Sequence, residues 1–255
     1  MEAILLGTGS SAGTPAIGCA CAACTSSDPR NNRLRSSIAV FGDDGTSIVI
    51  DTGPDFRQQM LKARIIRLDG VLYTHTHADH LNGIDDLRAF CFIHRHAIPI
   101  YGNVETLNEI QSRFQYAFLP PSGYWERPVL TAKLVSKPFN IGSLAITPIP
   151  VWHGKQRILG WRINQMAYLT DVSEIPESSL ALLEDLDYLF LDCLRERPHP
   201  THLHLDMALS YAAKINAKKA VLIHMTHELE YGWLMKQIPP SIVVGYDMMH
   251  LRFYA

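Results

Sequence analysis

Four side chains that can bind a metal ion lie within six residues, and this feature constrains the fold more than any other. The segment His75-Thr76-His77-Ala78-Asp79-His80 has the pattern H-x-H-x-D-H and directly follows an apolar run, Val71-Leu72-Tyr73. Alternate side chains of a strand point to one side, so a strand that ends here directs His75 and His77 at a single ion. The last two ligands then face a second ion, and this mixture of imidazole and carboxylate suits Zn, Mn or Fe. Adjacent ions of this kind are typical of hydrolytic enzymes.

The composition is that of an ordinary globular protein. The chain has 255 residues, 47% hydrophobic and 19% charged, and we expect one domain over residues 1–255 with a sizeable core. The net charge of −2 gives no reason to expect nucleic acid beyond small nucleotides as a partner. No apolar stretch is long enough to cross a membrane, and the N-terminus lacks the basic flank and apolar length of a signal peptide. We therefore expect a cytoplasmic protein.

Short runs rich in Ile and Val and bounded by Gly, Asp or Pro predict strands. They span residues 3–6, 38–41, 47–50, 70–73, 98–101, 144–151, 160–163, 166–169, 188–191, 220–223 and 242–244. Helices are predicted at 54–63, 81–92, 104–114, 177–184, 206–215 and 228–237, with Pro54 in the first helical turn. This order favours an α/β fold with two packed sheets and helices outside, an αββα sandwich, although βαβ folds share the pattern.

Three further residues of ligand type each follow a strand-like run. His153 follows residues 146–152, Asp171 follows 166–170, and His224 follows 219–223. Taken singly, such residues are often hydrogen-bonded structural histidines or turn and cap aspartates. Together with the H-x-H-x-D-H segment, they indicate the remaining ligands of a centre that holds two ions.

These residues resemble the metallo-β-lactamase-fold hydrolases, whose motif order is H-x-H-x-D-H, then His, Asp and His. The resemblance covers nearly the full chain and implies two mixed β-sheets flanked by helices. It implies that Asp171 bridges two ions and, like Asp79, serves catalysis, and that Asp51 orients a ligand. By the resemblance, the first ion is held by His75, His77 and His153, and the second by Asp79, His80 and His224.

A second candidate metal site lies near the N-terminus. Cys19, Cys21 and Cys24 form a C-x-C-x-x-C pattern in a loop that begins with Gly18. Five cysteines, an odd number with three so close together, argue against disulfides and favour thiolate ligands. A structural Zn²⁺ site is tetrahedral and needs a fourth ligand, for which His227 is the candidate.

The thiolate pattern narrows the resemblance to the cyclic phosphate phosphodiesterases of the carbon–phosphorus lyase (phosphonate degradation) pathway, although a protein of pyrroloquinoline quinone biosynthesis shares it. In these phosphodiesterases, a histidine of an H-x-D segment before a helix assists the departure of the leaving group. The segment His202-Leu203-His204-Leu205-Asp206 matches, which implies this role for His204, with His202 as the alternative. An imidazolium at this position can protonate the departing oxygen.

The resemblance thus implies a metal-dependent phosphodiesterase for small, including cyclic, phosphodiesters, acting through a hydroxide that bridges two Mn²⁺ or Zn²⁺ ions. A histidine at position 77 favours hydrolysis over the oxygen chemistry of di-iron relatives, which have glutamate there. Three alternatives stay open. A tRNA 3′-processing nuclease would need a basic insertion that is not evident, a lactonase or thioester hydrolase leaves His204 without a role, and a cofactor-pathway binding protein would not catalyse. The expected partner is a small phosphodiester, and the resemblance points to a homodimer.

Overall fold

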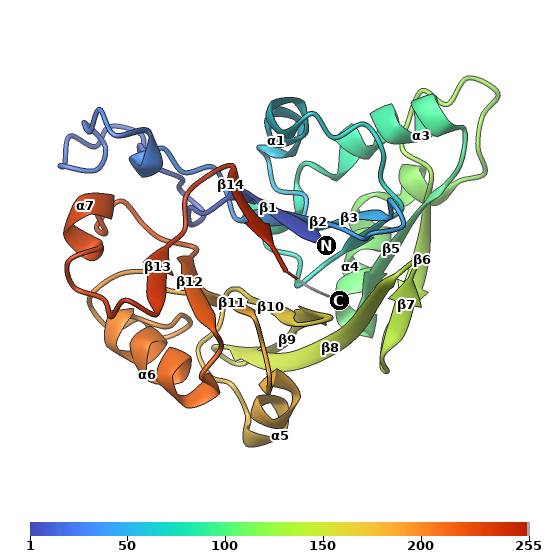
Figure 1. Ribbon diagram of the computed structural model, residues 1–255. Helices are drawn as coiled ribbons and strands as arrows, with labels where there is room; N and C mark the ends of the chain where they lie inside the picture. Colours follow the sequence, from blue (N-terminus) through green and yellow to red (C-terminus); the bar gives the residue numbers. More distant parts are fainter. Residues whose placement is uncertain (254–255) are drawn as a thin grey trace.

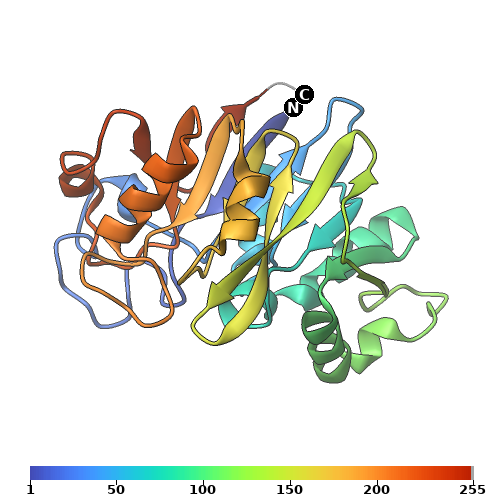
Figure 2. The same ribbon diagram turned by 90° about the horizontal axis from the view of Figure 1, so that it is seen from below.

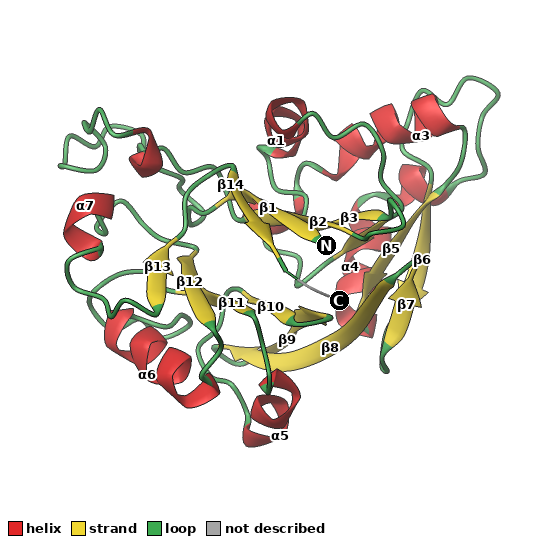
Figure 3. Ribbon diagram, in the orientation of Figure 1, coloured by secondary structure: helices red, strands yellow, loops and turns green. Residues whose placement is uncertain are grey.

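Two seven-stranded β-sheets pack face to face at the centre of the protein, with helices on their outer sides (Figure 1). The computed structural model describes residues 1–253. The strand order is β14-β1-β2-β3-β4-β5-β6 in the first sheet and β13-β12-β11-β10-β9-β8-β7 in the second. Figure 3 shows the sheets in yellow between the red helices. The predicted αββα sandwich is therefore confirmed.

The elements have the following bounds. The first sheet contains β1 (Glu2–Gly7), β2 (Ser37–Phe41), β3 (Ser47–Ile50), β4 (Gly70–Leu72), β5 (Ile98–Gly102), β6 (Leu130–Leu134) and β14 (Met249–Arg252). The second contains β7 (Phe139–Ile141), β8 (Leu144–His153), β9 (Gln156–Ile163), β10 (Met166–Leu169), β11 (Tyr188–Asp192), β12 (Lys219–Ile223) and β13 (Ile242–Val244). The α-helices are α1 (Phe56–Ala63), α2 (Ala78–Leu81), α3 (Arg88–His94), α4 (Val104–Arg113), α5 (Glu177–Leu180), α6 (Leu205–Ile215) and α7 (Tyr231–Leu234). Short 3₁₀ helices are η1 (Pro29–Asn31), η2 (Ile84–Leu87), η3 (Gln115–Phe118) and η4 (Ala181–Leu183).

Each sheet has an antiparallel half and a parallel half. Strands β3 to β6 run parallel in the first sheet, and β10 to β13 run parallel in the second. Strand β8 is antiparallel to β9, which is antiparallel to β10, so β8 and β10 point the same way. The carboxyl ends of parallel strands in such sheets are the usual place for a functional site. The loops after β3, β4, β8, β10, β11 and β12 are therefore the ones that matter here.

The alternation of strand side chains builds three apolar layers. In β2, Ile38 and Val40 face the layer between the two sheets, whereas Ala39 faces the helices that cover the first sheet. In β11, Phe190 faces the layer between the sheets, and its neighbours Leu189 and Leu191 face the helices on the other side. A period of two residues separates the two faces of a strand. Figure 2 shows the two sheets from below.

The helix predicted over residues 81–92 is broken into α2, η2 and α3. The N–H of Gly83 donates to the carbonyl of Thr52, 2.8 Å away, and not to a helical acceptor. A Cβ atom at Gly83 would collide with the carbonyl of Gly53, so the break brings two backbones together where only glycine fits. Helix α1 begins at Phe56, so Pro54 lies before the helix and not in its first turn. Strands β6, β7 and β14 were not predicted.

The long N-terminal segment, residues 8–36, lies beside α7 at the left of Figures 1 and 3. Gly9 forms a β-bridge with Met225, and the side chain of Asn31 donates to Glu230 at 2.8 Å. These contacts place the cysteine loop next to the segment that follows β12. Within residues 1–253, no helix combines the length and the apolar character needed to span a membrane.

Candidate metal centre

The candidate ligands lie at strand ends, where the backbone turns sharply. Asp51 follows β3, Asp171 follows β10, and His224 follows β12, with φ angles of 63°, 59° and 57°. Residues other than glycine rarely adopt this left-handed conformation, and they do so mainly where surrounding contacts hold them. At each of these positions, the turn directs a buried side chain toward one centre between the sheets.

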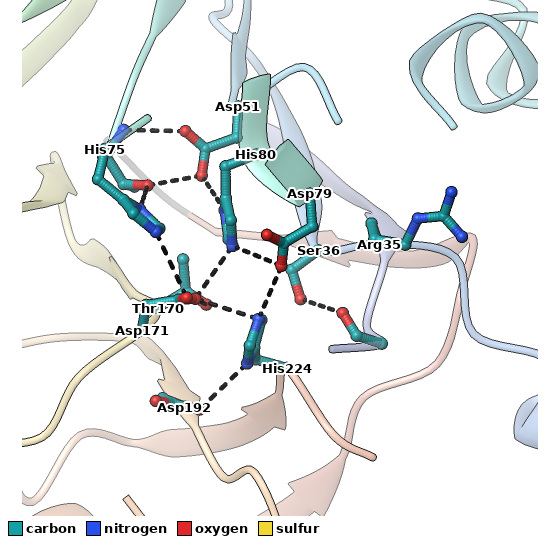
Figure 4. A network of polar contacts seen from close by, with 12 residues as sticks. Arg35, Ser36, Asp51, His75, Asp79, His80, Thr170, Asp171, Asp192 and His224 are labelled. Atoms are coloured by element: carbon teal, nitrogen blue, oxygen red, sulfur yellow. Dashed lines mark hydrogen bonds and ion pairs between the residues drawn. The ribbon is translucent and has the colours of Figure 1, made fainter. Parts of the chain in front are cut away.

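Two groups of ligand atoms converge at this centre. Figure 4 shows Asp79, His80, Asp171 and His224 pointing toward one another, with His75 beside them. The ligand atoms in each group lie within 4.8 Å of one another. The first group contains His75, His77, His153 and Asp171, and the second contains Asp79, His80, Asp171 and His224. Asp171 belongs to both groups, as the resemblance implied.

The two carboxylate oxygens of Asp171 face different groups. Its Oδ1 lies 3.1 Å from Nε2 of His80 and 3.1 Å from Nε2 of His224. Its Oδ2 lies 3.5 Å from Nε2 of His75 and 3.9 Å from Nε2 of His153. A carboxylate in this position can coordinate one ion with each oxygen.

Hydrogen bonds fix the ring orientation of three histidines. Nδ1 of His80 lies 2.7 Å from Oδ2 of Asp51, and Nδ1 of His153 lies 2.8 Å from the carbonyl oxygen of Thr201. Because neither acceptor can donate, both Nδ1 atoms carry a hydrogen, and the Nε2 atoms are the ones left to bind a metal. The third ring, His75, is held in the same way by Thr74.

The Thr74 hydroxyl lies 2.8 Å from Asp51 and 2.9 Å from Nδ1 of His75. Since the hydroxyl donates its hydrogen to the carboxylate of Asp51, it accepts the hydrogen of the imidazole. The backbone N–H of Thr74 donates to the other oxygen of Asp51, also at 2.8 Å. Asp51 thus orients His80 directly and His75 through Thr74.

The chemistry of the donor set fits a pair of divalent ions. Within the described residues, Nε2 of His75 and Nε2 of His80 are buried without a hydrogen-bond partner. A buried polar atom without a partner is costly unless something else satisfies it. Imidazole nitrogens and carboxylate oxygens at these positions are the ligands that Zn²⁺ and Mn²⁺ take.

The second group carries strong electrostatic coupling. Burial alone would raise the pKa of Asp171, but His224, His80 and His75 outweigh burial and hold it well below its usual range. Burial alone would likewise lower the pKa of His224, but the Asp171 and Asp192 carboxylates raise it to about 10. For His80, too, the neighbouring carboxylates outweigh burial, and its pKa lies well above the ordinary value. Without an ion, these two histidines therefore hold protons.

The first group is different because burial dominates there. Burial lowers the pKa of His153 to about 4 and also lowers the pKa of His77. These imidazoles are neutral at physiological pH and ready to bind a metal. His77 is exposed whereas His75 and His153 are buried, so this side of the centre opens to solvent.

Asp192 at the end of β11 is a component that the sequence reasoning missed. It is fully buried, and its Oδ2 accepts from Nδ1 of His202 at 2.9 Å and from the backbone N–H of Val172 at 2.8 Å. Its Oδ1 lies 3.6 Å from Nδ1 of His224. The sequence does contain a pattern that points to Asp192, because this residue follows the predicted strand 188–191 just as Asp171 follows the predicted strand 166–169.

His202, and not His204, reaches the centre. The His202 ring lies 4.8 Å from the ring of His153 and stacks on that of His224 at 5.0 Å. Its Nε2 lies 4.0 Å from Asp171. His204 occupies the N-cap position of α6, where the chain turns into the helix. Within residues 1–253, no hydrogen bond or ion pair joins its side chain to the ligands.

The cysteine loop also forms a compact group with His227. The Sγ atoms of Cys19 and Cys21 lie 3.4 and 3.3 Å from Nδ1 of His227, and Cys24 completes a set within 4.8 Å. A hydrogen bond from the Cys24 backbone N–H, followed by one from His227, lowers the pKa of Cys21 to about 6. Three sulfurs and one imidazole nitrogen match a closed tetrahedral zinc site.

Comparisons with known proteins agree with this geometry. A family model described as the beta-lactamase superfamily domain matches residues 46–225. The chain is 39% identical over 251 residues to the octanoyltransferase of Porphyromonas gingivalis. That match covers 97% of this chain but 50% of the relative, so the chain spans half of that protein's length.

Two solved structures are especially similar. A diphosphatase from the PhnP family superposes with a TM-score of 0.92 at 39% identity, covering 100% of this chain and 98% of that one. Zn²⁺-bound PqqB from Methylobacterium extorquens superposes with a TM-score of 0.81 at 17% identity, covering 99% and 100%. The second likeness shows the fold alone.

Proposed function

Since the chain belongs to the β-lactamase superfamily and is a metallo-β-lactamase-fold hydrolase of the PhnP family, we propose that it hydrolyses small phosphodiesters, cyclic ones included. One observation carries this proposal. His202 is held by Asp192 with its Nε2 atom beside Asp171, at the edge of the two ligand groups. A phosphodiester releases an alkoxide, which needs a proton, and an imidazole placed here can supply one.

We further propose that the centre holds two Mn²⁺ or Zn²⁺ ions and that the cysteine group holds one structural Zn²⁺. Bound at the centre, two divalent ions supply positive charge to the phosphate oxygens and lower the pKa of the attacking water. The support for the pair is the shared carboxylate of Asp171 together with the buried Nε2 atoms of His75 and His80, which lack a hydrogen-bond partner.

The chain's own residues then have distinct roles. Asp79 and Asp171, whose pKa values the neighbouring histidines hold low against the effect of burial, stay ionised and would hold the ions, while the proton of the attacking water passes to solvent. The water oxygen forms a bond to phosphorus, and the bond from phosphorus to the leaving oxygen breaks. Nε2 of His202 gives its proton to that oxygen, while Asp192 holds the ring in place. We assign this role to His202 in place of His204.

A second candidate function is the hydrolysis of diphosphates. The observation in its favour is the PhnP-family diphosphatase, which is 39% identical over the whole chain. The chemistry is closely related, since the leaving group is then a phosphate and not an alkoxide. The octanoyltransferase is matched over half of its length by this chain, so its activity is no evidence for the reaction at the metal centre.

A metal analysis combined with a substrate panel tests the proposal. The panel contains bis(p-nitrophenyl) phosphate, a 2′,3′-cyclic nucleotide, a cyclic ribose phosphate, a diphosphate diester, a lactone, a thioester and a tRNA precursor. We expect metal-dependent turnover of the small phosphodiesters. Turnover confined to the lactone, the thioester or the tRNA precursor would overturn the proposal, and so would a fully metal-loaded protein that hydrolyses nothing in the panel.

We propose that the protein acts on small phosphodiesters and not on long nucleic acids, and that it forms a homodimer. Light scattering of the purified protein measures its mass in solution and tests the dimer directly.

A further inference from the structure

Arg113, the last residue of α4, is bound to both sides of the metal-binding segment. Its Nη1 donates to the carbonyl oxygen of Thr76 at 2.8 Å, and its Nη2 donates to Oδ1 of Asn82 at 2.6 Å. Thr76 lies between His75 and His77, and Asn82 ends the short helix α2, which carries Asp79 and His80. The guanidinium group is thus held in a fixed orientation against the segment that supplies four ligands.

The charge of Arg113 has no counter-ion in the structure. Both of its acceptors are neutral, and within residues 1–253 no carboxylate lies within ion-pair distance of it. Nearby Asp85 is bound by Arg88 and Tyr116 instead. A guanidinium has five N–H donors, and two of them are used, so the exposed side of Arg113 offers a positive charge and free donors to solvent.

One of the two groups that Arg113 binds, the Thr76 carbonyl, lies beside the exposed ligand of the centre. Thr76 is the neighbour in sequence of two metal ligands, His75 and His77. The extended chain advances about 3.5 Å per residue, so its carbonyl lies close to both. Of these two, His77 is the exposed one. An anionic substrate that approaches the centre from the side of His77 would pass the Thr76 carbonyl to which the guanidinium of Arg113 is bound.

We propose that Arg113 is a specificity-determining residue that binds a second anionic group attached to the scissile phosphate, so that the preferred substrates are diphosphates and related phosphoanhydrides. The inference rests on the proposed hydrolysis of phosphate compounds at this centre and favours its second candidate, the hydrolysis of diphosphates. Planar guanidinium groups bind phosphate oxygens with paired hydrogen bonds, and a second phosphate is one bridging oxygen away from the first. A substrate with a single phosphate does not engage this group.

Kinetics of the variant Arg113→Gln provide the first test. Glutamine can still bond a neutral carbonyl but carries no charge. For a diphosphate diester we expect KM to rise about tenfold with kcat within about twofold, which is the loss of one charge-assisted hydrogen bond. For bis(p-nitrophenyl) phosphate we expect KM to change by less than about twofold. Arg113→Lys keeps the charge and should restore part of the lost affinity for the diphosphate diester.

Binding provides a second readout that does not need turnover. Isothermal titration of the metal-loaded protein with methylene diphosphonate and with methyl phosphonate gives a ratio of two dissociation constants. We expect the wild type to prefer the diphosphonate and Arg113→Gln to lose about tenfold of that preference. If the wild type hydrolyses no phosphate compound, the proposed function fails, and this ratio still decides the role of Arg113.

Arg162→Gln is the matched control. Arg162 also donates only to neutral carbonyls, those of Asn164, Leu182 and Glu184, but it pairs with Thr147, six residues before His153 on β8. We expect Arg162→Gln to leave KM and kcat unchanged for both substrates. An equal rise in KM for both substrates in Arg113→Gln, or a lower metal content in this variant, would mean that Arg113 only stabilises the loop. Either result would overturn the inference. Unchanged constants for both substrates, or no preference of the wild type for the diphosphonate, would also overturn it.

Discussion

Nδ1 of His202 lies 2.9 Å from Oδ2 of Asp192, and this buried pair places an imidazole against the metal ligands. The pairing fixes the hydrogen on Nδ1 and leaves Nε2 directed at the centre, 4.0 Å from Asp171. The relationship joins the end of β11 to the loop before α6. It distinguishes His202, which is held against the metal ligands, from His204, which lies at the start of α6.

Replacement of His202 by alanine should slow phosphodiester hydrolysis without loss of metal. We expect kcat for bis(p-nitrophenyl) phosphate to fall by roughly 10²–10³, the usual contribution of a general acid. Steady-state kinetics with metal analysis by mass spectrometry measure both quantities. His204→Ala is the control and should retain nearly full activity. A larger effect of His204→Ala than of His202→Ala would contradict the assignment.

Replacement of Asp171 by asparagine should reduce the number of ions that the protein retains. One of the two oxygens becomes an amide nitrogen, which does not bind a metal, and the charge that both groups share is lost. Asparagine tolerates the left-handed backbone at this position, where φ is 59°. Asp185→Asn, at an exposed residue with φ of 54°, controls for the backbone effect and should keep the full metal content.

Acidification should remove the ion of the second group before that of the first. His224, with a pKa raised to about 10, and His80 must lose protons before they bind a metal, so affinity in this group falls as pH falls. Burial holds the pKa of His153 at about 4, so proton competition in its group begins only in stronger acid. Dialysis from about pH 8 to about pH 6 should leave one ion per centre, and simultaneous loss of both ions would refute this order.

In the metal-free protein, Cys21 should be the most reactive thiol at neutral pH. The thiolate is the nucleophile, and the pKa of Cys21 is lowered to about 6 by the Cys24 backbone N–H and then by His227. Burial raises the pKa of Cys24 to about 11, so it stays a thiol. Iodoacetamide labelling read by mass spectrometry should reach half its maximal rate near pH 6 at Cys21. Equal labelling of both residues at neutral pH would contradict this expectation, and bound zinc should protect both.

The sequence predicted the ligand positions better than the contacts around them. Ligands after strands could be recognised because each strand is a short apolar run with a polar exit, as at Asp171 and His224. Asp192 could not be recognised as readily, because the partner that reveals its role, His202, lies in a different loop. The choice between His202 and His204 depends on where α6 begins, and sequence patterns locate a helix boundary only to within a few residues.

The same limit explains the errors in the fold. The break between α2 and α3 depends on the close approach of Gly83 to Gly53, a tertiary contact that periodicity does not contain. Exposed residues, polar ones among them, interrupt the apolar pattern of strands β6 and β14. Strand β8 was predicted because its apolar residues recur along a long run, a pattern that is visible in the sequence without any tertiary contact.

The segment from His224 to His227 contributes His224 to the second group of the centre and His227 to the cysteine group. Met225 between them is fixed by pairing with Gly9, and Arg33 binds the carbonyl oxygen of Thr226 at 2.9 Å. The number of residues in this segment is therefore as constrained as their identity. If a single residue were inserted here, His224 and His227 could not both keep their positions, and one of the two groups would lose its ligand. We therefore expect natural variation in length to be confined to other loops.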